Sequence, residues 1–238
     1  MLLVIKNVLD KNQLKVMAKL LQDAEFATGI QSAGKEAARV KNNLELSQQT
    51  RTEEVLHQQL NQMLMPSLLQ HSDYQNSVYP LKVATPFYVR YDKGMHYDFH
   101  VDDPIMGAAA NPQERYRSDV STTVFLNDDY TGGELIIKTS TGEVSIKAQA
   151  GDAVVYSSHY LHKVNEVTSG SRMVAVTWAQ SMVKDSAKRE MLYELSQARD
   201  SLLATNDSID ESSNAESTLA RSQISNVYTN LLRRWSDL

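Results

Sequence analysis

The stretch VATPFYVRYDKGMHYDFHVDD, residues 83–103, sets the character of the middle of the chain. It holds two short runs rich in β-branched and aromatic residues, separated by a turn signal at residues 92–94. Comparable runs follow, divided by breaks that carry Gly, Asn or Asp: STTVFLN, GGELIIKT, GEVSIKA, GDAVVYSS, YLHKVNEV and SRMVAVTWAQ. Closely spaced short strands with such turns are typical of an antiparallel sandwich or barrel, which we expect over residues 80–183.

The region before this β segment, residues 1–79, is predicted to be mostly helical and to pack on the core. A short strand is expected at residues 2–5. A helix should follow it, because Asp10 can cap a helix and apolar residues then recur at helical spacing. The polar stretch 34–51 is predicted to be a loop, and a second helix after it should be limited by Pro66.

The region after the β segment, residues 184–238, is predicted to return to helix. Asp185 can cap the first helix, and the Ser/Asn/Asp-rich stretch 203–217 should be a loop or linker. The last helix carries an apolar stripe of period 3.6, formed by Ile224, Val227, Tyr228, Leu231, Leu232 and Trp235. We expect this stripe to pack on the outside of the β domain, with a homodimer through the helical ends as the alternative.

Composition excludes several classes of protein. The 238 residues are 42% hydrophobic and 22% charged, as in ordinary globular proteins. The net charge of −5 offers no basic excess for a polyphosphate backbone, so no nucleic-acid partner is expected. No apolar run is long enough to span a bilayer, and the N-terminal apolar patch lacks the features of a signal peptide. We therefore expect a cytoplasmic protein without a membrane partner.

The chain contains no cysteine. Disulfides, thiolate zinc sites, iron–sulfur clusters and cysteine nucleophiles are all excluded. Any metal ion must therefore be held by histidines and carboxylates.

Six histidines are candidates for such a site. His57 is expected on the surface of a helix and His71 in a polar loop. The other four lie in the β region as two pairs: His96 and His100, then His159 and His162.

The His-x-Asp spacing has a geometric meaning. Residues i and i+2 of a strand point to the same side, so an imidazole and a carboxylate can bind one cation. A second histidine from another strand would complete a two-His-one-carboxylate triad with open positions, which suits non-haem Fe(II). The spacing occurs at His71/Asp73, His96/Asp98 and His100/Asp102.

Among these pairs we favour His100 with Asp102. Val101 and Phe99 extend the strand pattern there, whereas His96 closely follows the turn at residues 92–94. In one unbroken strand, however, the two His-x-Asp pairs of this run would share a face.

The second histidine is His159 or His162. His162 lies in the strand-like run YLHKV, and His159 lies in a polar segment. Arg172 follows ten residues after His162. The turn at Ser169–Gly170 predicts that the two runs form a hairpin, with Arg172, Val174, Val176 and Trp178 alternating against Met173, Ala175 and Thr177.

This hairpin would place Arg172 inside the sandwich, beside the metal. A buried guanidinium requires an anion, and its planar fork suits a carboxylate. A structural Arg–Asp pair or a surface strand end is the equally weighted alternative. His96, Asp98 and Asp103 should lie near the mouth of the site, either as surface charges or in support of the metal and substrate.

The ordered segments HVD (100–102), FLNDDYTGGEL (125–135), AGDAVVYSSHYLHKV (150–164) and Arg172 before VTWAQS (176–181) resemble the Fe(II)/2-oxoglutarate-dependent dioxygenases. They look most like the bacterial PKHD-type hydroxylases, which are related to prolyl 4-hydroxylases. The resemblance also reaches VKNN (40–43) and the C-terminal segments AKREMLYEL and NLLRRWSDL, so it covers most of the chain.

The resemblance implies a fold and a set of residue roles. The fold would be α+β, a double-stranded β-helix (jelly roll) with flanking N- and C-terminal helices. His100, Asp102 and His162 would be iron ligands, and Arg172 would hold the distal carboxylate of 2-oxoglutarate. Tyr91 would assist with that carboxylate, with Tyr88 as the alternative. Animal prolyl hydroxylases usually carry Lys in place of this Arg, so a collagen-like substrate is not implied.

The implied activity is hydroxylation of a substrate with release of succinate and CO₂, with L-ascorbate keeping the iron reduced. The substrate would be a peptide or small molecule, such as a prolyl or lysyl residue or a compound linked to iron uptake. The loop at 103–118, either a mobile lid or an ordinary surface loop, and the stretch 30–50 are expected to line its pocket. The alternatives are a cupin-like metal protein with redox-neutral chemistry and a non-catalytic binding module.

Overall fold

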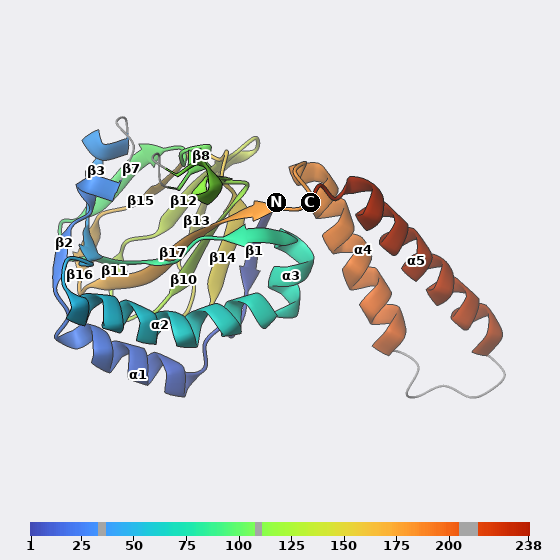
Figure 1. Cartoon of the computed structure of the whole chain (residues 1–238), viewed down its shortest axis with the longest axis horizontal. Coiled ribbons are helices and arrows are strands. Elements are labelled where there is room, and N and C mark those ends of the chain that lie inside the picture. Colours follow the sequence, from blue (N-terminus) through green and yellow to red (C-terminus); the bar gives the residue numbers. More distant parts are fainter. Residues whose placement is uncertain (33–36, 108–110, 205–213) are drawn as a thin grey trace.

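Two antiparallel sheets face each other in the computed structural model, and three helices cover the outer side of the larger one (Figure 1). The structure describes residues 1–32, 37–107, 111–204 and 214–238. Every strand pairing among the described residues is antiparallel, as the sequence predicts.

The larger sheet has eight strands. Their spatial order is β1 (Leu2–Ile5), β14 (Ala153–Ser157), β10 (Val120–Phe125), β17 (Arg172–Ser181), β6 (Phe87–Tyr91), β4 (Leu44–Leu46) and β2 (Phe26–Thr28), with β5 (Pro80–Val83) also paired to β17.

The smaller sheet has five strands, and two short pairs complete the β structure. The smaller sheet runs β13 (Gly142–Ile146), β12 (Leu135–Thr139), β15 (His162–Val164), β7 (His96–His100) and β3 (Lys41–Asn42). The short pairs are β11 (Thr131–Gly132) with β16 (Val167–Ser169), and β8 (Ile105–Met106) with β9 (Tyr116–Arg117).

The helices fall into two groups (Figure 1). The first group is α1 (Lys11–Gln22), α2 (Arg51–Gln70) and α3 (Ser72–Val78), beside the sheets; the second is α4 (Ser186–Ala204) and α5 (Asn214–Trp235). Short 3-10 turns are η1 (Gly29–Ser32), η2 (Ala37–Arg39) and η3 (Pro112–Glu114).

Strand alternation builds two separate cores. Along β17, Val174 faces the space between the sheets, whereas Ala175 faces the helices. Along β10, Phe125 likewise faces the space between the sheets, and Val124 faces the helices. The predicted alternation of β17 is therefore confirmed. It matters for function because the residues on the inner face of the larger sheet are aimed at the smaller sheet.

The N-terminal region differs from the prediction in two ways. The strand at residues 2–5 and the helix capped by Asp10 are confirmed, and Gln13 completes the capping box. The stretch 34–51, predicted as a loop, instead contains β3 and β4, so this region supplies strands to both sheets. Residues 33–36 lie outside the described residues.

Pro66 does not end α2, contrary to the prediction. The helix continues to Gln70, because Leu64 and Leu68 on either side of the proline are fully buried against the larger sheet's core. The hydroxyl of Ser67 also donates to the carbonyl of Met63 within this turn. Tertiary packing thus outweighs the backbone hydrogen bond that proline cannot make.

The hairpin predicted around Ser169–Gly170 is also wrong. β15 pairs with β12 and β7 in the smaller sheet, whereas β17 pairs with β10, β6 and β5 in the larger one. The chain crosses between the sheets through β16 and the turn at Gly170, where φ is +75°. The consequence is that His162 and Arg172 approach the same space from opposite sheets.

The C-terminal stripe packs differently from the expectation. α5 lies against α4 in a helical hairpin that points away from the sandwich (Figure 1). Tyr228 and Trp235 join Leu192 of α4 and Val183 in a small separate core. The stripe is therefore covered mainly by the preceding helix and not by the outside of the β domain. Of the predicted linker, residues 205–213 lie outside the described residues.

No helix among the described residues combines the length and the apolar character needed to cross a membrane.

Candidate active site

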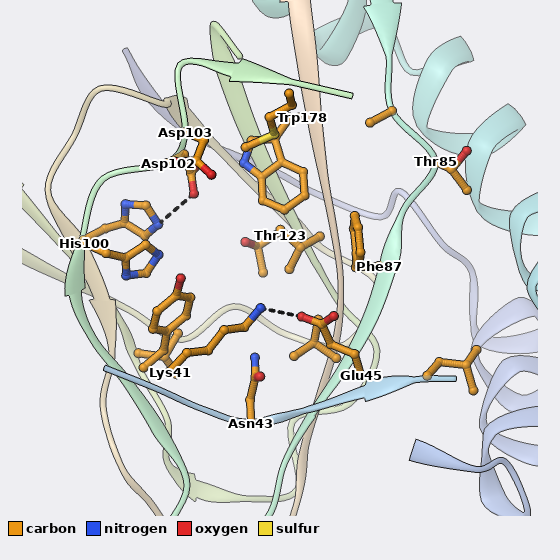
Figure 2. A pocket seen from close by; sticks show the side chains of 18 of the residues that line it. Lys41, Asn43, Glu45, Thr85, Phe87, His100, Asp102, Asp103, Thr123 and Trp178 are labelled. Atoms are coloured by element: carbon orange, nitrogen blue, oxygen red, sulfur yellow. Dashed lines mark hydrogen bonds and ion pairs between the residues drawn. The ribbon is translucent and has the colours of Figure 1, made fainter. Parts of the chain in front are cut away.

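Three side chains converge at one end of the space between the sheets. His100 ends β7, His162 begins β15, and Asp102 lies two residues beyond the end of β7. Their ligand atoms all lie within 4.8 Å of one another. His162 Nε2 is 3.8 Å from Asp102 Oδ1. Figure 2 shows His100 and Asp102 directed into the pocket.

A β-bulge aims His100 at this cluster. His162 pairs with His100 and Val164 pairs with Tyr97, so three residue steps on β7 oppose two on β15. Tyr97 and His100 therefore both face inward, with ring centroids 3.6 Å apart and nearly parallel planes. Asp98 falls within the bulge and is exposed to solvent.

The bulge resolves the choice among the His-x-Asp pairs. His96 and Asp98 do not line the pocket, whereas His100 and Asp102 do. His159 is exposed and its ring lies beside Tyr160, so His162 is the histidine that joins the cluster.

Hydrogen bonds prepare both imidazoles to bind a cation. His100 Nδ1 is 2.8 Å from the carbonyl oxygen of Asp98, and His162 Nδ1 is 2.9 Å from that of Tyr160. A carbonyl can only accept, so each Nδ1 is a hydrogen-bond donor, and in the neutral form of either ring the lone pair available to a cation is on Nε2. Burial, reinforced by the neighbouring His162, holds the pKa of His100 well below its usual value.

A cavity of about 870 Å³ extends from the cluster between the two sheets. Its inner part is lined from the larger sheet by Val89, Tyr91, Thr123, Tyr156 and Arg172, and from the smaller sheet by Leu135 and Val164.

Arg172 is the charged group of this inner part. Its side chain is buried, at 1% exposure, and its Nε makes no hydrogen bond. Within the described part of the chain, no carboxylate lies within 4.0 Å of the guanidinium. Its central carbon instead lies 5.1 Å from the ring centroid of Tyr91 and 5.3 Å from that of Phe125. Neither a structural Arg–Asp pair nor a surface strand end describes this position.

The two candidate tyrosines face opposite ways. Tyr91 lines the cavity, in register with Arg172, and its hydroxyl accepts a hydrogen bond from Asn43 Nδ2 at 3.2 Å. Burial raises the pKa of Tyr91, so the phenol keeps its proton and can donate it to an anion. Tyr88 packs in the helix-side core and donates to Asn61 Oδ1 at 2.9 Å.

The outer part of the cavity contains residues that sequence reasoning did not single out. Lys41 forms an ion pair with Glu45 along one wall, and Phe87 packs edge-on against Trp178 on another (Figure 2). The sequence does contain an indication of a strand here, because residues 41, 43 and 45 have the spacing of one strand face. The polarity of this stretch nevertheless favoured a loop.

The predicted pocket loops are found at the cavity. Residues 41–49 line one wall, and Asp103, Met106 and Tyr116 line another. Asp103 is exposed at this wall. The segment read as a mobile lid contains the pair β8–β9, and its residues 108–110 lie outside the described residues.

Two histidines outside the site differ from expectation. His57 is buried under β4, with Nε2 3.4 Å from the carbonyl oxygen of Leu46, and is not a surface residue. His71 is the N-cap of α3, where its Nδ1 accepts from the backbone N–H of Asp73.

The residues present fit a ferrous ion and 2-oxoglutarate. Two imidazoles and one carboxylate can bind one face of an octahedral ion and leave three positions open. The buried guanidinium, which has no carboxylate partner among the described residues, is chemically suited to the distal carboxylate of a dicarboxylate.

Comparisons with known proteins agree with this chemistry. The family model described as the 2OG-Fe(II) oxygenase superfamily matches residues 86–180. A PKHD-type hydroxylase of Gluconobacter oxydans is 39% identical over 243 residues, and one of Thioalkalivibrio sulfidiphilus is 43% identical over 241 residues. Both alignments cover 100% of this chain and 100% of the relative.

Solved structures share the fold at low identity. A Trichoplax adhaerens prolyl hydroxylase, solved with a peptide fragment of hypoxia inducible factor, has a TM-score of 0.51 at 14% identity, over 76% of this chain and 83% of that one. HygX of Streptomyces hygroscopicus, solved with nickel, 2-oxoglutarate and hygromycin B, has a TM-score of 0.52 at 12% identity, over 75% and 82%.

The full-length identity to curated relatives and the matching family model therefore show that this chain, a 2-oxoglutarate-dependent dioxygenase with a jelly-roll core, belongs to the PKHD-type hydroxylases of the 2OG-Fe(II) oxygenase superfamily.

Proposed function

We propose that His100, Asp102 and His162 hold the ferrous ion, and that 2-oxoglutarate binds between this ion and Arg172. The observation that supports it most strongly is the buried guanidinium, which lies in the same cavity as the ligand cluster and has no carboxylate partner among the described residues. When bound, iron and 2-oxoglutarate would supply the oxidation that hydroxylates the substrate and releases succinate and CO₂.

The protein's own groups have distinct tasks in this arrangement. Arg172 offers a planar fork to the distal carboxylate, and Tyr91 donates its hydroxyl proton to the same group, because Asn43 already occupies one of its lone pairs. The apolar side chains of Leu135 and Val164 flank the chain of the keto acid and exclude water.

The outer part of the cavity is the proposed substrate site. Its volume of about 870 Å³ exceeds what a five-carbon dicarboxylate fills, and the excess lies beside the Lys41–Glu45 pair and the aromatic pair of Phe87 and Trp178. A peptide side chain such as prolyl or lysyl, or a small molecule linked to iron uptake, is the proposed occupant.

Further expectations are part of the proposal. Ascorbate would keep the iron reduced, the protein would act in the cytoplasm, and it would use neither nucleic acid nor membrane as a partner. A homodimer would form through the helical ends. Residues 80–183 would form the dioxygenase domain, flanked by the regions 1–79 and 184–238.

The test is succinate release from 2-oxoglutarate by purified protein with Fe(II) and ascorbate. His100→Ala, Asp102→Ala and His162→Ala should each abolish turnover, because two remaining ligands cannot hold the ion. His159→Ala is the matched control, since this exposed histidine lies three residues from His162 and outside the pocket. Equal turnover by the triad variants and the parent protein would contradict the proposal.

A further inference from the structure

The second carboxylate oxygen of Asp102 has a dedicated partner. Oδ1 faces His162, whereas Oδ2 accepts a short hydrogen bond from the hydroxyl of Ser121. Ser121 is fully buried on β10, on the same face as Thr123, which lines the cavity. Neither the sequence pattern nor the comparisons assign it a role.

A second serine lies behind the first. The hydroxyl oxygen of Ser158 is 2.8 Å from that of Ser121, and its side chain is 2% exposed. A serine hydroxyl has one hydrogen, and Ser121 gives its hydrogen to Asp102. Ser158 must therefore donate to Ser121, which makes a chain of two hydroxyls that ends on the carboxylate.

Burial strengthens the hydrogen bonds of this pair of hydroxyls. Each donation polarises the next hydroxyl, and both oxygens are shielded from competing water. Asp102 needs such a constraint, because it lies beyond the end of β7 and its backbone has no strand partner among the described residues.

We propose that Ser121, supported by Ser158, is a positioning residue that keeps Asp102 a one-oxygen metal ligand. A carboxylate can bind a cation through one oxygen or two. If Oδ2 turned toward the ion, it would occupy one of the three positions that the cosubstrate and dioxygen require. The hydroxyl of Ser121 holds Oδ2 away from the ion. This inference rests on the proposed metal site.

The experiment measures Co²⁺ binding to the full chain by titration calorimetry, without 2-oxoglutarate. Ser121→Ala should weaken binding by about 10–100-fold, as is typical when a group that orients a metal ligand is lost. Ser158→Ala should weaken it less, because Ser121 still donates to the carboxylate. Ser121→Thr keeps the hydroxyl and should restore binding to within about threefold of the parent protein. Ser157→Ala is the matched control, because Ser157 is equally buried and adjacent to Ser158 but its hydroxyl has no hydrogen-bond partner in the described part of the chain.

The visible absorption of bound Co²⁺ separates positioning from simple destabilisation. Ser121→Ala should change the band shape and intensity, because a two-oxygen carboxylate alters the coordination. If Ser121 had a purely structural role, Ser121→Ala would lower the urea midpoint of the metal-free protein and leave the Co²⁺ spectrum unchanged. Should Ser121→Ala fold poorly, Ser158→Ala gives the same readouts.

The outcomes are distinguishable. Parent-like affinity and spectrum in Ser121→Ala and Ser158→Ala would overturn the role of the serines and leave the metal site intact. Absence of Co²⁺ binding by the parent protein, or parent-like binding by His100→Ala, would overturn the metal site and this inference with it.

Discussion

At the scale of single residues, Arg172, the proposed partner of the 2-oxoglutarate carboxylate, is buried without a carboxylate partner among the described residues. A buried guanidinium without a carboxylate partner among the described residues has lost its hydration, and the rings of Tyr91 and Phe125 lie beside it. Such a position destabilises the ligand-free protein and favours binding of an anion.

This balance predicts opposite effects on binding and on stability. Arg172→Met should raise the KM for 2-oxoglutarate about tenfold or more, because it removes hydrogen bonds worth about 1.5–3 kcal/mol to a charged group. The free energy of unfolding of the ligand-free variant should stay equal or increase. Succinate release and urea unfolding measure the two effects. A large loss of stability with an unchanged KM would indicate a structural arginine.

His57 predicts part of the pH dependence of stability. Burial lowers its pKa in the folded state, opposed by the Leu46 carbonyl and by Glu53. The unfolded chain, with a pKa near about 6.5, therefore takes up a proton at higher pH than the folded protein. The contribution of His57 to the free energy of unfolding should be fully present above this pH and should decrease as the pH falls below it. Urea midpoints at pH 7.5 and pH 5 measure the change.

His57→Gln keeps a donor for the Leu46 carbonyl and removes the titration. The loss of stability between the two pH values should be smaller in this variant than in the parent protein. An equal loss in both proteins would show that other buried groups carry the dependence.

At the scale of secondary structure, the bulge in β7 decides which of its histidines joins the candidate ligand cluster. A regular strand would place His96, Asp98 and His100 on one face. The extra residue opposite β15 brings Tyr97 and His100 to the inner face and leaves Asp98 in solvent.

This geometry gives a prediction for four single variants. His96→Ala and Asp98→Ala should bind Co²⁺ within about twofold of the parent protein, because neither side chain lines the pocket. His100→Ala and Asp102→Ala should lose about 100-fold or more. Titration calorimetry distinguishes the pairs. Loss of binding in the His96 or Asp98 variant would mean that the strand has another register.

At the scale of the whole molecule, the helical hairpin of α4 and α5 has its own small core, although α4 also packs against α3. Its small core around Leu192 and Tyr228 shares no residue with the two cores of the sandwich, and none of its residues lines the cavity. Arg189 is buried in the first turn of α4 and donates to backbone carbonyls. One of them is the carbonyl of Asp119, the residue before β10, so Arg189 connects the hairpin to the larger sheet.

This separation predicts a local effect. Leu192→Ala removes a fully buried side chain and should cost about 2–5 kcal/mol within the hairpin core. Hydrogen exchange should accelerate over residues 186–204 and 214–235, whereas Co²⁺ affinity should stay within about twofold of the parent. Met191→Ala, at an exposed neighbouring position, is the control. Accelerated exchange throughout the sandwich would show that the hairpin and sandwich unfold together.

The sequence alone determined the β character of residues 80–183, the flanking helices and the short set of polar residues able to bind a metal. These are local properties: side-chain periodicity, turn residues and ligand chemistry can be read within a few positions. The resemblance to a family then assigned roles to His100, Asp102, His162 and Arg172.

Tertiary structure decided how these pieces meet. Only the pairing of distant strands could show that the polar stretch 34–51 supplies β3 and β4, that β15 and β17 belong to opposite sheets, and that Ser121 holds Asp102. A strand's register and the partner of a buried polar atom depend on residues far away in the sequence, which local patterns do not encode.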